Sequence, residues 1–379
     1  MNNKYHYFLA CTFFIVISAF FPSCKKSQTQ VEQLPDPQIK SGMVKVYGKL
    51  NDPTSQVTSL ILWSPTPVTA NESIFETQVE KDGSFYFEVP IECSTVFSSI
   101  YSPGYGGFMI ELSSGEDTKI ELNLDNTNKL KEVNMTGNRL LTNQDKEYCA
   151  KAINRYADFH SIDVELVRKM THEEYAQYEL NTEMPKRIDY AMEGAKFSDA
   201  GKTFVLNELK LLQLGGGLLK YKERLEMLSG NKANESVQEP DIQYYSFLKS
   251  FNLDNPQYLY SSYYSKIMQT LLSREALNIP PISDTPVEEW LSKVKATLSD
   301  LLGFDSGQFY DLLAANAYAK QFNEEVTPLS DKQKNNIKEY FGDGEIAKIL
   351  LRKNEEIIKL AERKSAVVVN KTPNVPKEE

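Results

Sequence analysis

The spacing of apolar residues divides the chain into a strand-forming part and a helix-forming part. From residue 43 to about residue 135, apolar and polar positions alternate with a period of two, which is typical of strands with one buried face. A Lys-Asp-Gly turn at residues 81–83 precedes the alternating run SFYFEV at residues 84–89, and this order indicates a hairpin. About seven short strands at this spacing predict an antiparallel β-sandwich over residues 43–137.

From about residue 138 the apolar spacing becomes helical. Two capping-box pairs, Thr171 with Glu174 and Ser330 with Gln333, mark helix starts. We therefore predict an all-α domain over residues 138–364, so that the fold class is α+β. The predicted helices cover residues 143–158, 161–170, 171–194, 199–213, 217–229, 241–251, 256–276, 286–302, 306–323, 331–341 and 345–364.

The N-terminus has the pattern of a secretory signal. Residues 7–21 are apolar, a run too short to span a bilayer comfortably, and Lys4 precedes them. Ser23, a small residue, stands directly before Cys24, as in lipoprotein processing sites. We predict a lipoprotein signal peptide over residues 1–23, lipidation of Cys24 and a lipid anchor in the membrane. An uncleaved anchor helix is the alternative.

A polar tether is predicted over residues 24–42, which contain two prolines. Lys25 and Lys26 follow the predicted lipidation site directly, and the first acidic residue after it is Glu32. Bacteroidetes lipoproteins that reach the cell surface tend to carry acidic residues soon after this position. Because this chain lacks early acidic residues, the comparison favours an anchor in the cell envelope that faces the periplasm.

Composition bounds the size and the charge of the folded part. The chain has 379 residues, of which 41% are hydrophobic and 25% charged, so it can form two or three domains with buried cores. Removal of the predicted signal, which has one basic and no acidic residue, changes the net charge from −10 to about −11. This charge argues against a nucleic-acid partner, which needs a basic face, and against attraction to an anionic membrane surface.

Four cysteines occur in the chain. Cys11 leaves with the predicted signal and Cys24 is acylated, which leaves Cys93 and Cys149 without any Cys-x-x-Cys motif. A disulfide between these two is possible, because the periplasm permits disulfides. The other interpretation is that both are small, buried apolar side chains.

The polar residues form no recognisable catalytic pattern. The two histidines after the predicted signal, His160 and His172, do not share a predicted helix, and no zinc motif occurs. The three glycines at residues 215–217 lack the Lys-Ser/Thr pair and the preceding strand of a phosphate loop, so they indicate a helix break with close packing. We predict no catalytic residue, no metal site and no cofactor.

Two groups of aromatic residues are candidates for ligand binding. Tyr101, Tyr105 and Phe108 surround glycines in a predicted loop of the sandwich, and loops at sandwich ends carry binding sites. Tyr245 and Tyr260 belong to an aromatic-rich stretch and could line a groove between two helices. Exposed aromatic side chains stack on sugars or peptides, whereas the helical spacing of this second group indicates packing in a core.

Several features together resemble a known family. A lipoprotein signal and a tether precede a small sandwich containing KDGSF at residues 81–85, and a long helical region leads to the tail VVNKTPNVP at residues 368–376. This order resembles the N-terminal half of the TlpA-like, thioredoxin-fold lipoproteins of Bacteroides and relatives. In that family a similar tail leads into a thioredoxin domain with a Trp-Cys-x-x-Cys active site. The resemblance implies that residues 365–379, a short β-like run and a Pro-containing stretch, form a linker toward a C-terminal domain that is absent here.

No catalytic residue of that family can be carried over, because its cysteine pair has no match in this chain. We therefore expect a non-catalytic, lipid-anchored periplasmic module that positions or recruits a thioredoxin-fold domain or its substrate. A glycan- or peptide-binding lipoprotein that uses the aromatic groups is the alternative.

Overall fold

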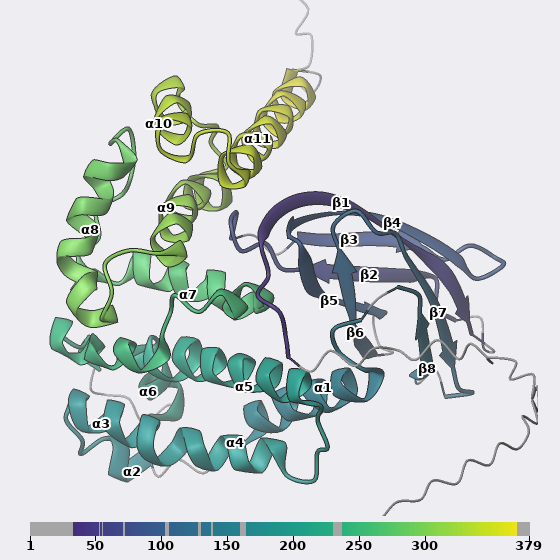
Figure 1. The fold of residues 1–379 in the computed structure, drawn as a ribbon, viewed down its shortest axis with the longest axis horizontal. Coiled ribbons are helices and arrows are strands. Elements are labelled where there is room, and N and C mark those ends of the chain that lie inside the picture. Colours follow the sequence, from purple (N-terminus) through teal and green to yellow (C-terminus); the bar gives the residue numbers. More distant parts are fainter. Residues whose placement is uncertain are drawn as a thin grey trace, which may run out of the picture. The chain divides into compact units, whose positions relative to one another are not determined.

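The computed structural model describes residues 33–52, 54, 56–70, 73–102, 106–127, 130–137, 139–159, 164–229 and 237–369 (Figure 1). These residues belong to one compact unit. The predicted α+β class is confirmed, because all strands precede all helices in the described chain. The strands are β1 (Ile39–Asn51), β2 (Ser59–Ser64), β3 (Ser73–Gln78), β4 (Ser84–Cys93), β5 (Thr95–Ser102), β6 (Gly106–Ser113), β7 (Thr118–Leu124) and β8 (Leu130–Met135).

Two four-stranded sheets form the sandwich. One sheet has the order β4-β1-β7-β8 and the other the order β3-β2-β5-β6, so that β6 and β8 are both edge strands. Neighbouring strands are antiparallel, as predicted, except for β1 and β7, which run parallel. The chain between β1 and β7 passes through both sheets, and parallel pairing needs such a long connection.

The period-two pattern explains which face each strand buries. In β4 the side chains of Phe85 and Phe87 are buried in the sandwich, whereas Tyr86 between them is exposed. Gly48 on β1 pairs with Ile120 on β7, and a Cβ at this glycine would lie 1.7 Å from the Ile120 carbonyl oxygen. A glycine is therefore required for the close approach of these two central strands.

The described chain after β8 consists of helices and the loops that connect them. They are α1 (Asn143–Asp158), α2 (Val164–Val167), α3 (His172–Tyr178), α4 (Met184–Met192), α5 (Asp199–Gln213), α6 (Tyr221–Ser229), α7 (Ser262–Ser273), α8 (Val287–Leu302), α9 (Gln308–Lys320), α10 (Asp331–Phe341) and α11 (Glu345–Val369). Three segments are π-helical, namely η1 (Glu179–Glu183), η2 (Leu214–Leu218) and η7 (Gln321–Glu325). Three more are 3₁₀ helices, namely η4 (Ile242–Phe251), η5 (Pro256–Tyr260) and η6 (Glu275–Leu277).

The predicted bounds of α1, α5 and α10 match the observed ones. The helix predicted over residues 171–194 is interrupted by the π-helical turn η1, and the one predicted over residues 241–251 is a 3₁₀ helix. The spacing of apolar residues does not distinguish α-, π- and 3₁₀-helices, because in each of them residues three or four positions apart can lie on one buried face.

The C-terminal helix is longer than predicted. α11 continues to Val369, so the β-like run predicted at residues 367–369 is wrong and these residues extend the helix. Continuing an existing helix through a β-branched residue costs at most about 0.7 kcal/mol relative to alanine. The rest of the predicted linker, residues 370–379, lies outside the described residues.

The predicted tether ends well before residue 42. Leu34 is buried, and the carbonyl oxygens of Leu34 and Pro35 accept hydrogen bonds from Gln257 Nε2 (2.8 Å) and Tyr260 OH (3.0 Å). β1 then begins at Ile39, ahead of the sandwich start predicted at residue 43. A polar sequence does not reveal that its backbone carbonyls bind side chains from distant helices. Residues 24–32, Cys24 included, lie outside the described residues.

Helices cover the outer face of the β3-β2-β5-β6 sheet. The ring of Phe97 on β5 packs against Phe204 on α5 and Tyr260 on η5, with centroid distances of 4.6 and 5.1 Å. Asn316 on α9 is fully buried and donates hydrogen bonds to the carbonyl oxygens of Pro67 and Val68. Contacts of this kind join the sandwich and the helices into one body.

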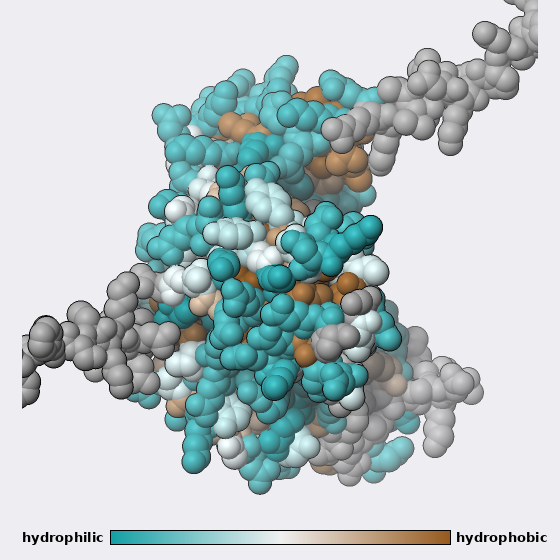
Figure 2. All heavy atoms as spheres, turned by 90° about the vertical axis from the view of Figure 1, so that its right-hand side faces the viewer, coloured by the Kyte–Doolittle hydropathy of each residue, from teal (hydrophilic) through white to brown (hydrophobic). Residues whose placement is uncertain are grey.

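Figure 2 shows one side of the molecule, on which hydrophilic residues cover most of the surface and hydrophobic residues form small, separate areas. Among the described residues, none of the helices combines the length and the apolar composition that crossing a bilayer requires.

Candidate functional site

Both tyrosines proposed as ligand-binding residues on the helices are buried. The side chain of Tyr245 is 1% exposed and that of Tyr260 is 3% exposed. The ring of Tyr245 packs edge-on against Tyr244, and the hydroxyl of Tyr260 donates a hydrogen bond to the Pro35 carbonyl. This burial favours the other interpretation of the sequence, in which the helical spacing of the group indicates packing in a core.

The other aromatic candidates lie on strands rather than on a loop. Tyr101 is at the end of β5 and Phe108 is in β6, and both are half-buried. Tyr101 pairs with Gly107, the neighbour of Phe108, across the two strands. Tyr105 lies outside the described residues.

Cys93 and Cys149 do not form the disulfide that the sequence left open. Both are free and buried, and they belong to different apolar clusters. Burial raises the pKa of both thiols, which makes the reactive thiolate scarce. The alternative interpretation, two small apolar side chains in a core, describes their environment.

The histidines that follow the predicted signal peptide form no metal site in the described part of the molecule. His172 packs edge-on against the rings of Tyr221 and Tyr244, with centroid distances of 4.9 and 6.1 Å. His160 lies outside the described residues. No group of three or more His, Cys, Asp or Glu side chains within the described ranges is placed to hold a metal ion.

One cavity brings Phe108 together with residues that the sequence did not single out. It is a groove of about 600 Å³, and we call it the edge groove because the edge strands β6 and β8 and the helix α1 line it. Gly107, Phe108 and Met109 come from β6, residues 131–135 come from β8, and α1 contributes side chains between Asn143 and Asn154.

The backbone of β6 offers hydrogen-bonding groups at the edge groove. In a regular antiparallel strand, alternate residues direct both the N–H and the C=O group to the same side. The Glu111 carbonyl accepts a hydrogen bond from Arg139 Nη1 (3.1 Å), so Glu111, Met109 and Gly107 direct these groups away from β5. No described residue forms a hydrogen bond with the outward groups of Met109 and Gly107.

The β8 wall of the groove is also a strand edge. The Val133 carbonyl accepts a hydrogen bond from Asn143 Nδ2 (3.1 Å), so Val133 and Met135 direct their backbone groups away from β7. The side chains of Phe108, Val133 and Met135 pack against the sandwich core and give the groove an apolar lining. Lys131 on the same strand has no ion-pair partner among the described residues.

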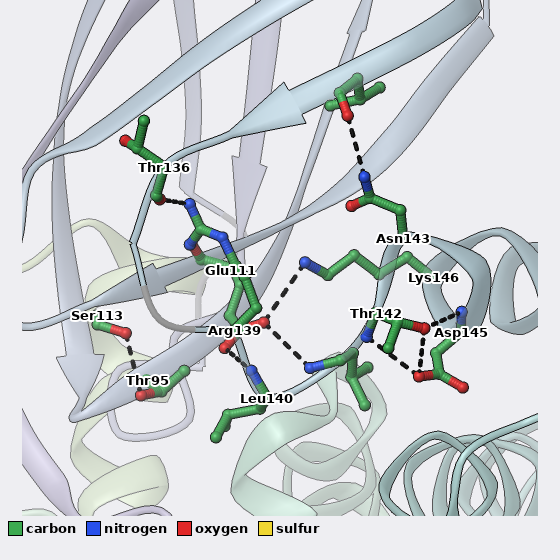
Figure 3. A network of polar contacts seen from close by, with 12 residues as sticks. Thr95, Glu111, Ser113, Thr136, Arg139, Leu140, Thr142, Asn143, Asp145 and Lys146 are labelled. Carbon is green, nitrogen blue, oxygen red and sulfur yellow. Dashed lines mark hydrogen bonds and ion pairs between the residues drawn. The ribbon is translucent and has the colours of Figure 1, made fainter. Parts of the chain in front are cut away.

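A buried polar network lies beside the edge groove (Figure 3). Glu111 on β6 is 1% exposed, and its carboxylate accepts a hydrogen bond from the Leu140 amide (2.7 Å). The same carboxylate lies 3.5 Å from Lys146 Nζ on α1. Arg139 donates to the carbonyl oxygens of Glu111 and Thr136. Figure 3 shows these side chains converging from β6, from α1 and from the segment between β8 and α1.

Lys146 is a buried cation with incomplete hydrogen bonding. Its side chain is 5% exposed and lines the groove. At 3.5 Å its contact with Glu111 is an ion pair, and Nζ donates no hydrogen bond to any described residue. Burial lowers the pKa of Lys146, an effect that the charge of Glu111 opposes. An ammonium with three unused donors gains from an additional oxygen acceptor.

The N-terminus of α1 fixes the third wall of the groove. Thr142 and Asp145 form a capping box. The Asp145 carboxylate also accepts hydrogen bonds from the Ser198 amide and hydroxyl, at 2.8 and 2.9 Å. Burial disfavours the ionised form of Asp145, but the hydrogen bonds outweigh this effect and hold its pKa below the ordinary value. The wall that carries Lys146 is thus tied to the helix that follows Ser198.

A second cavity contains a carboxyl group with a raised pKa. It has a volume of about 320 Å³ and is lined by β2, β5, β6, by helices α1, α5 and α7, and by Tyr260 of η5. Glu208 on α5 faces it, and burial raises the pKa of Glu208 to about 7, although a hydrogen bond from Ser261 opposes the shift. Such a group changes its charge near neutral pH. Glu208 therefore couples the protonation of this cavity to the stability of the fold.

Sequence reasoning missed the residues that give the edge groove its chemistry. Met109, Lys131 and Lys146 were not singled out, because an edge position depends on which strands pair and not on local composition. The glycines near Phe108 predict a loop, whereas Gly106 and Gly107 belong to β6. The one local signal for Lys146 is its place on a helical face that also carries Cys149 and Ala152.

No family model matches this chain, and no curated protein matches it. The resemblance to TlpA-like proteins therefore stays a prediction, and the function has to be inferred from the geometry of the site.

Proposed function

We propose that this protein is a non-catalytic binding module that holds an extended polypeptide segment in the edge groove. The observation that carries the proposal is that two strand edges, those of β6 and β8, line a single cavity. An extended peptide adds to such an edge through main-chain hydrogen bonds, and its alternate side chains enter the pockets beside it.

The unused backbone groups of β6 set the binding mode. Gly107 and Met109 each direct an N–H and a C=O group outward, which suits a short antiparallel or parallel partner strand. Every second side chain of that strand would meet the apolar lining formed by Phe108, Val133 and Met135. A peptide with apolar residues at alternate positions therefore fits the groove best.

The charges at the groove favour carboxylate groups on the bound peptide. Lys131 has no ion-pair partner among the described residues, and Lys146 has unused N–H donors. Two acidic side chains line the groove: Glu147 is paired with Lys151, and Glu132 accepts a hydrogen bond from Asn123 Nδ2. An acidic side chain or a terminal carboxylate of the peptide would thus find complementary charge at Lys131, whereas Glu111 already balances the charge of Lys146.

The proposal includes the membrane address that the sequence predicts. A lipid anchor at Cys24 would hold the groove close to a membrane of the cell envelope, on the periplasmic side. The resemblance to TlpA-like proteins favours a thioredoxin-fold domain, or the substrate of such a domain, as the source of the bound segment. The anchor is tested separately, since a native mass spectrum with an unmodified Cys24 would remove the anchor and leave peptide binding untouched.

Glycan binding has less support in the geometry. Tyr245 and Tyr260 are buried, and Phe108 lies on the strand face that points toward the sandwich core. A sugar-binding site needs an exposed aromatic face on which the sugar ring can stack.

The test uses proline to remove one outward N–H group from each edge of the same sheet. Peptides selected from a random library against the full chain serve as probes. Met109→Pro removes an outward N–H of β6, and proline is tolerated where the N–H does not join the sheet. Glu76→Pro is the matched control on β3, the opposite edge, because the Val79 amide bonds the Thr58 carbonyl and places the Glu76 amide on the outer side.

A lost main-chain hydrogen bond of about 1 kcal/mol should weaken peptide binding about fivefold in Met109→Pro, and Glu76→Pro should bind like the original protein. Isothermal titration calorimetry measures both constants. Equal effects of the two prolines, or no effect of either, would show that the peptides bind elsewhere.

A further inference from the structure

A cavity among the helices contains two buried arginines that the edge groove does not involve. It has a volume of about 370 Å³ and is lined by residues of α1, α4, α5, η2 and α6. Arg187 on α4 is 9% exposed and Arg224 on α6 is 8% exposed, and both line the cavity. Buried arginines are rare unless an anion is close by, so the partners of each guanidinium decide what the cavity can bind.

Arg224 already has an internal partner. Its Nη2 atom lies 3.0 Å from Glu179 Oε1, and Glu179 is fully buried on η1. The other carboxylate oxygen of Glu179 accepts a hydrogen bond from Gln213, whose side-chain oxygen accepts one from Tyr156 OH. This chain of polar contacts neutralises Arg224 and holds it in place beside the cavity.

Arg187 has no such partner. No described residue forms an ion pair with it, and its Nε atom donates no hydrogen bond. Its guanidinium lies 5.8 Å from the centre of the Tyr156 ring, a contact that does not neutralise the charge. Glu183, one turn earlier, pairs with Lys186 and accepts a hydrogen bond from Tyr178 instead. Of the two guanidinium groups that line the cavity, that of Arg187 is therefore the one without a carboxylate partner among the described residues.

Two π-helical turns shape this cavity. Glu179 belongs to η1, and η2 places Gly216 and Gly217 in the cavity wall. A Cβ at Gly217 would lie 2.6 Å from Arg224 Nη1, whereas a Cβ at Gly216 would meet no atom within 4 Å. Isolated π-helical turns occur frequently at functional sites. The glycine run predicted as a helix break with close packing is thus a continuous π-helical turn, close-packed at Gly217 and open at Gly216.

We propose that this cavity binds a small organic monocarboxylate with an apolar body. Arg187 has no carboxylate partner among the described residues, and a guanidinium pairs with a carboxylate through two parallel hydrogen bonds. The remaining walls include Ala157, Phe159 and Leu212, which suit an apolar group. A cavity of this volume lies at the lower end of the range of small-molecule sites. Its lining shares no residue with the edge groove, so this proposal does not rest on peptide binding.

Four probes test the chemical class by isothermal titration calorimetry of the full chain. They are 3-phenylpropionate, the uncharged 3-phenylpropionamide, propionate and inorganic phosphate. We expect 3-phenylpropionate to bind at least tenfold more tightly than each of the other three, because only it combines one carboxylate with an apolar body. Phosphate or the amide binding as tightly would overturn the proposed ligand class.

Variants of the wall locate the bound probe. Arg187→Gln removes the guanidinium that has no carboxylate partner and should weaken 3-phenylpropionate binding at least tenfold, whereas the exposed Arg168→Gln should leave it unchanged. Gly216→Leu should block the cavity without a clash at Cβ, which keeps the test valid if Arg187→Gln fails to fold. Binding that survives Gly216→Leu, or that Arg168→Gln weakens equally, would place the ligand elsewhere and refute the site.

Discussion

Glu208 is a buried carboxyl group whose ionisation should destabilise the folded protein. Burial raises its pKa from the ordinary value of 4.5 to about 7. Between these values the folded state keeps a proton that the unfolded state has released, so stability falls as the pH rises through this window. At about 1.4 kcal/mol for each pH unit, the full loss is about 3 kcal/mol. Roughly 2.5 kcal/mol of this loss should fall between pH 5 and pH 8.

Glu208→Gln removes the titration while the side-chain oxygen can still accept the hydrogen bond from Ser261. We expect the free energy of unfolding in urea to be similar for the variant and the original protein at pH 5. At pH 8 the variant should be more stable by roughly 2–3 kcal/mol. Glu226→Gln, an exposed change on α6, is the matched control and should shift neither value. An equal difference between the Glu208 variant and the original protein at both pH values would refute a raised pKa.

Two further stability measurements and one labelling experiment test the packing of the protein. Gly217→Ala should lower the free energy of unfolding in urea by roughly 1–3 kcal/mol, because its Cβ would crowd Arg224 Nη1. Gly216→Ala should leave this free energy unchanged or raise it by about 0.5 kcal/mol. A larger loss for Gly216→Ala than for Gly217→Ala would contradict the assigned packing. Glu111→Gln should lower the free energy of unfolding by roughly 3 kcal/mol, because it leaves Lys146 buried without a charge partner. Adding Lys146→Met should recover most of that loss. If the effects of the two substitutions simply add, the two side chains do not interact. The two buried cysteines should react with a thiol reagent only after unfolding, and rapid labelling of the folded protein would show that they are accessible.

Features of secondary structure that depend on neighbouring residues, such as helix caps and the buried face of a strand, could be predicted from the sequence. Thr171 and Ser330 make the capping boxes that their spacing indicates, and the start of α10 is correct for that reason. The alternation in β4 likewise identified its buried face. The error at residues 367–369 arose because β-branched residues favour strands but are tolerated in an established helix.

The candidate sites could not be predicted in the same way, because they depend on long-range pairing. The edge groove exists because β6 and β8, which belong to different sheets, are both edges beside α1. The charge at Arg187 is noticeable only when the partner of Arg224 is known to be Glu179. The burial of Tyr245 and Tyr260 could not be predicted either, because composition reports aromatic content and not which ring faces solvent.

The central claim, that an extended peptide pairs with the edge of β6, is tested most directly by changing the peptide and leaving the protein intact. A selected peptide is methylated at one backbone nitrogen at a time, and its affinity for the full chain is measured. Strand pairing predicts that methylation weakens binding at every second position within the paired segment and has little effect between them. Uniform tolerance of methylation, or losses without this alternation, would contradict strand addition at the edge groove.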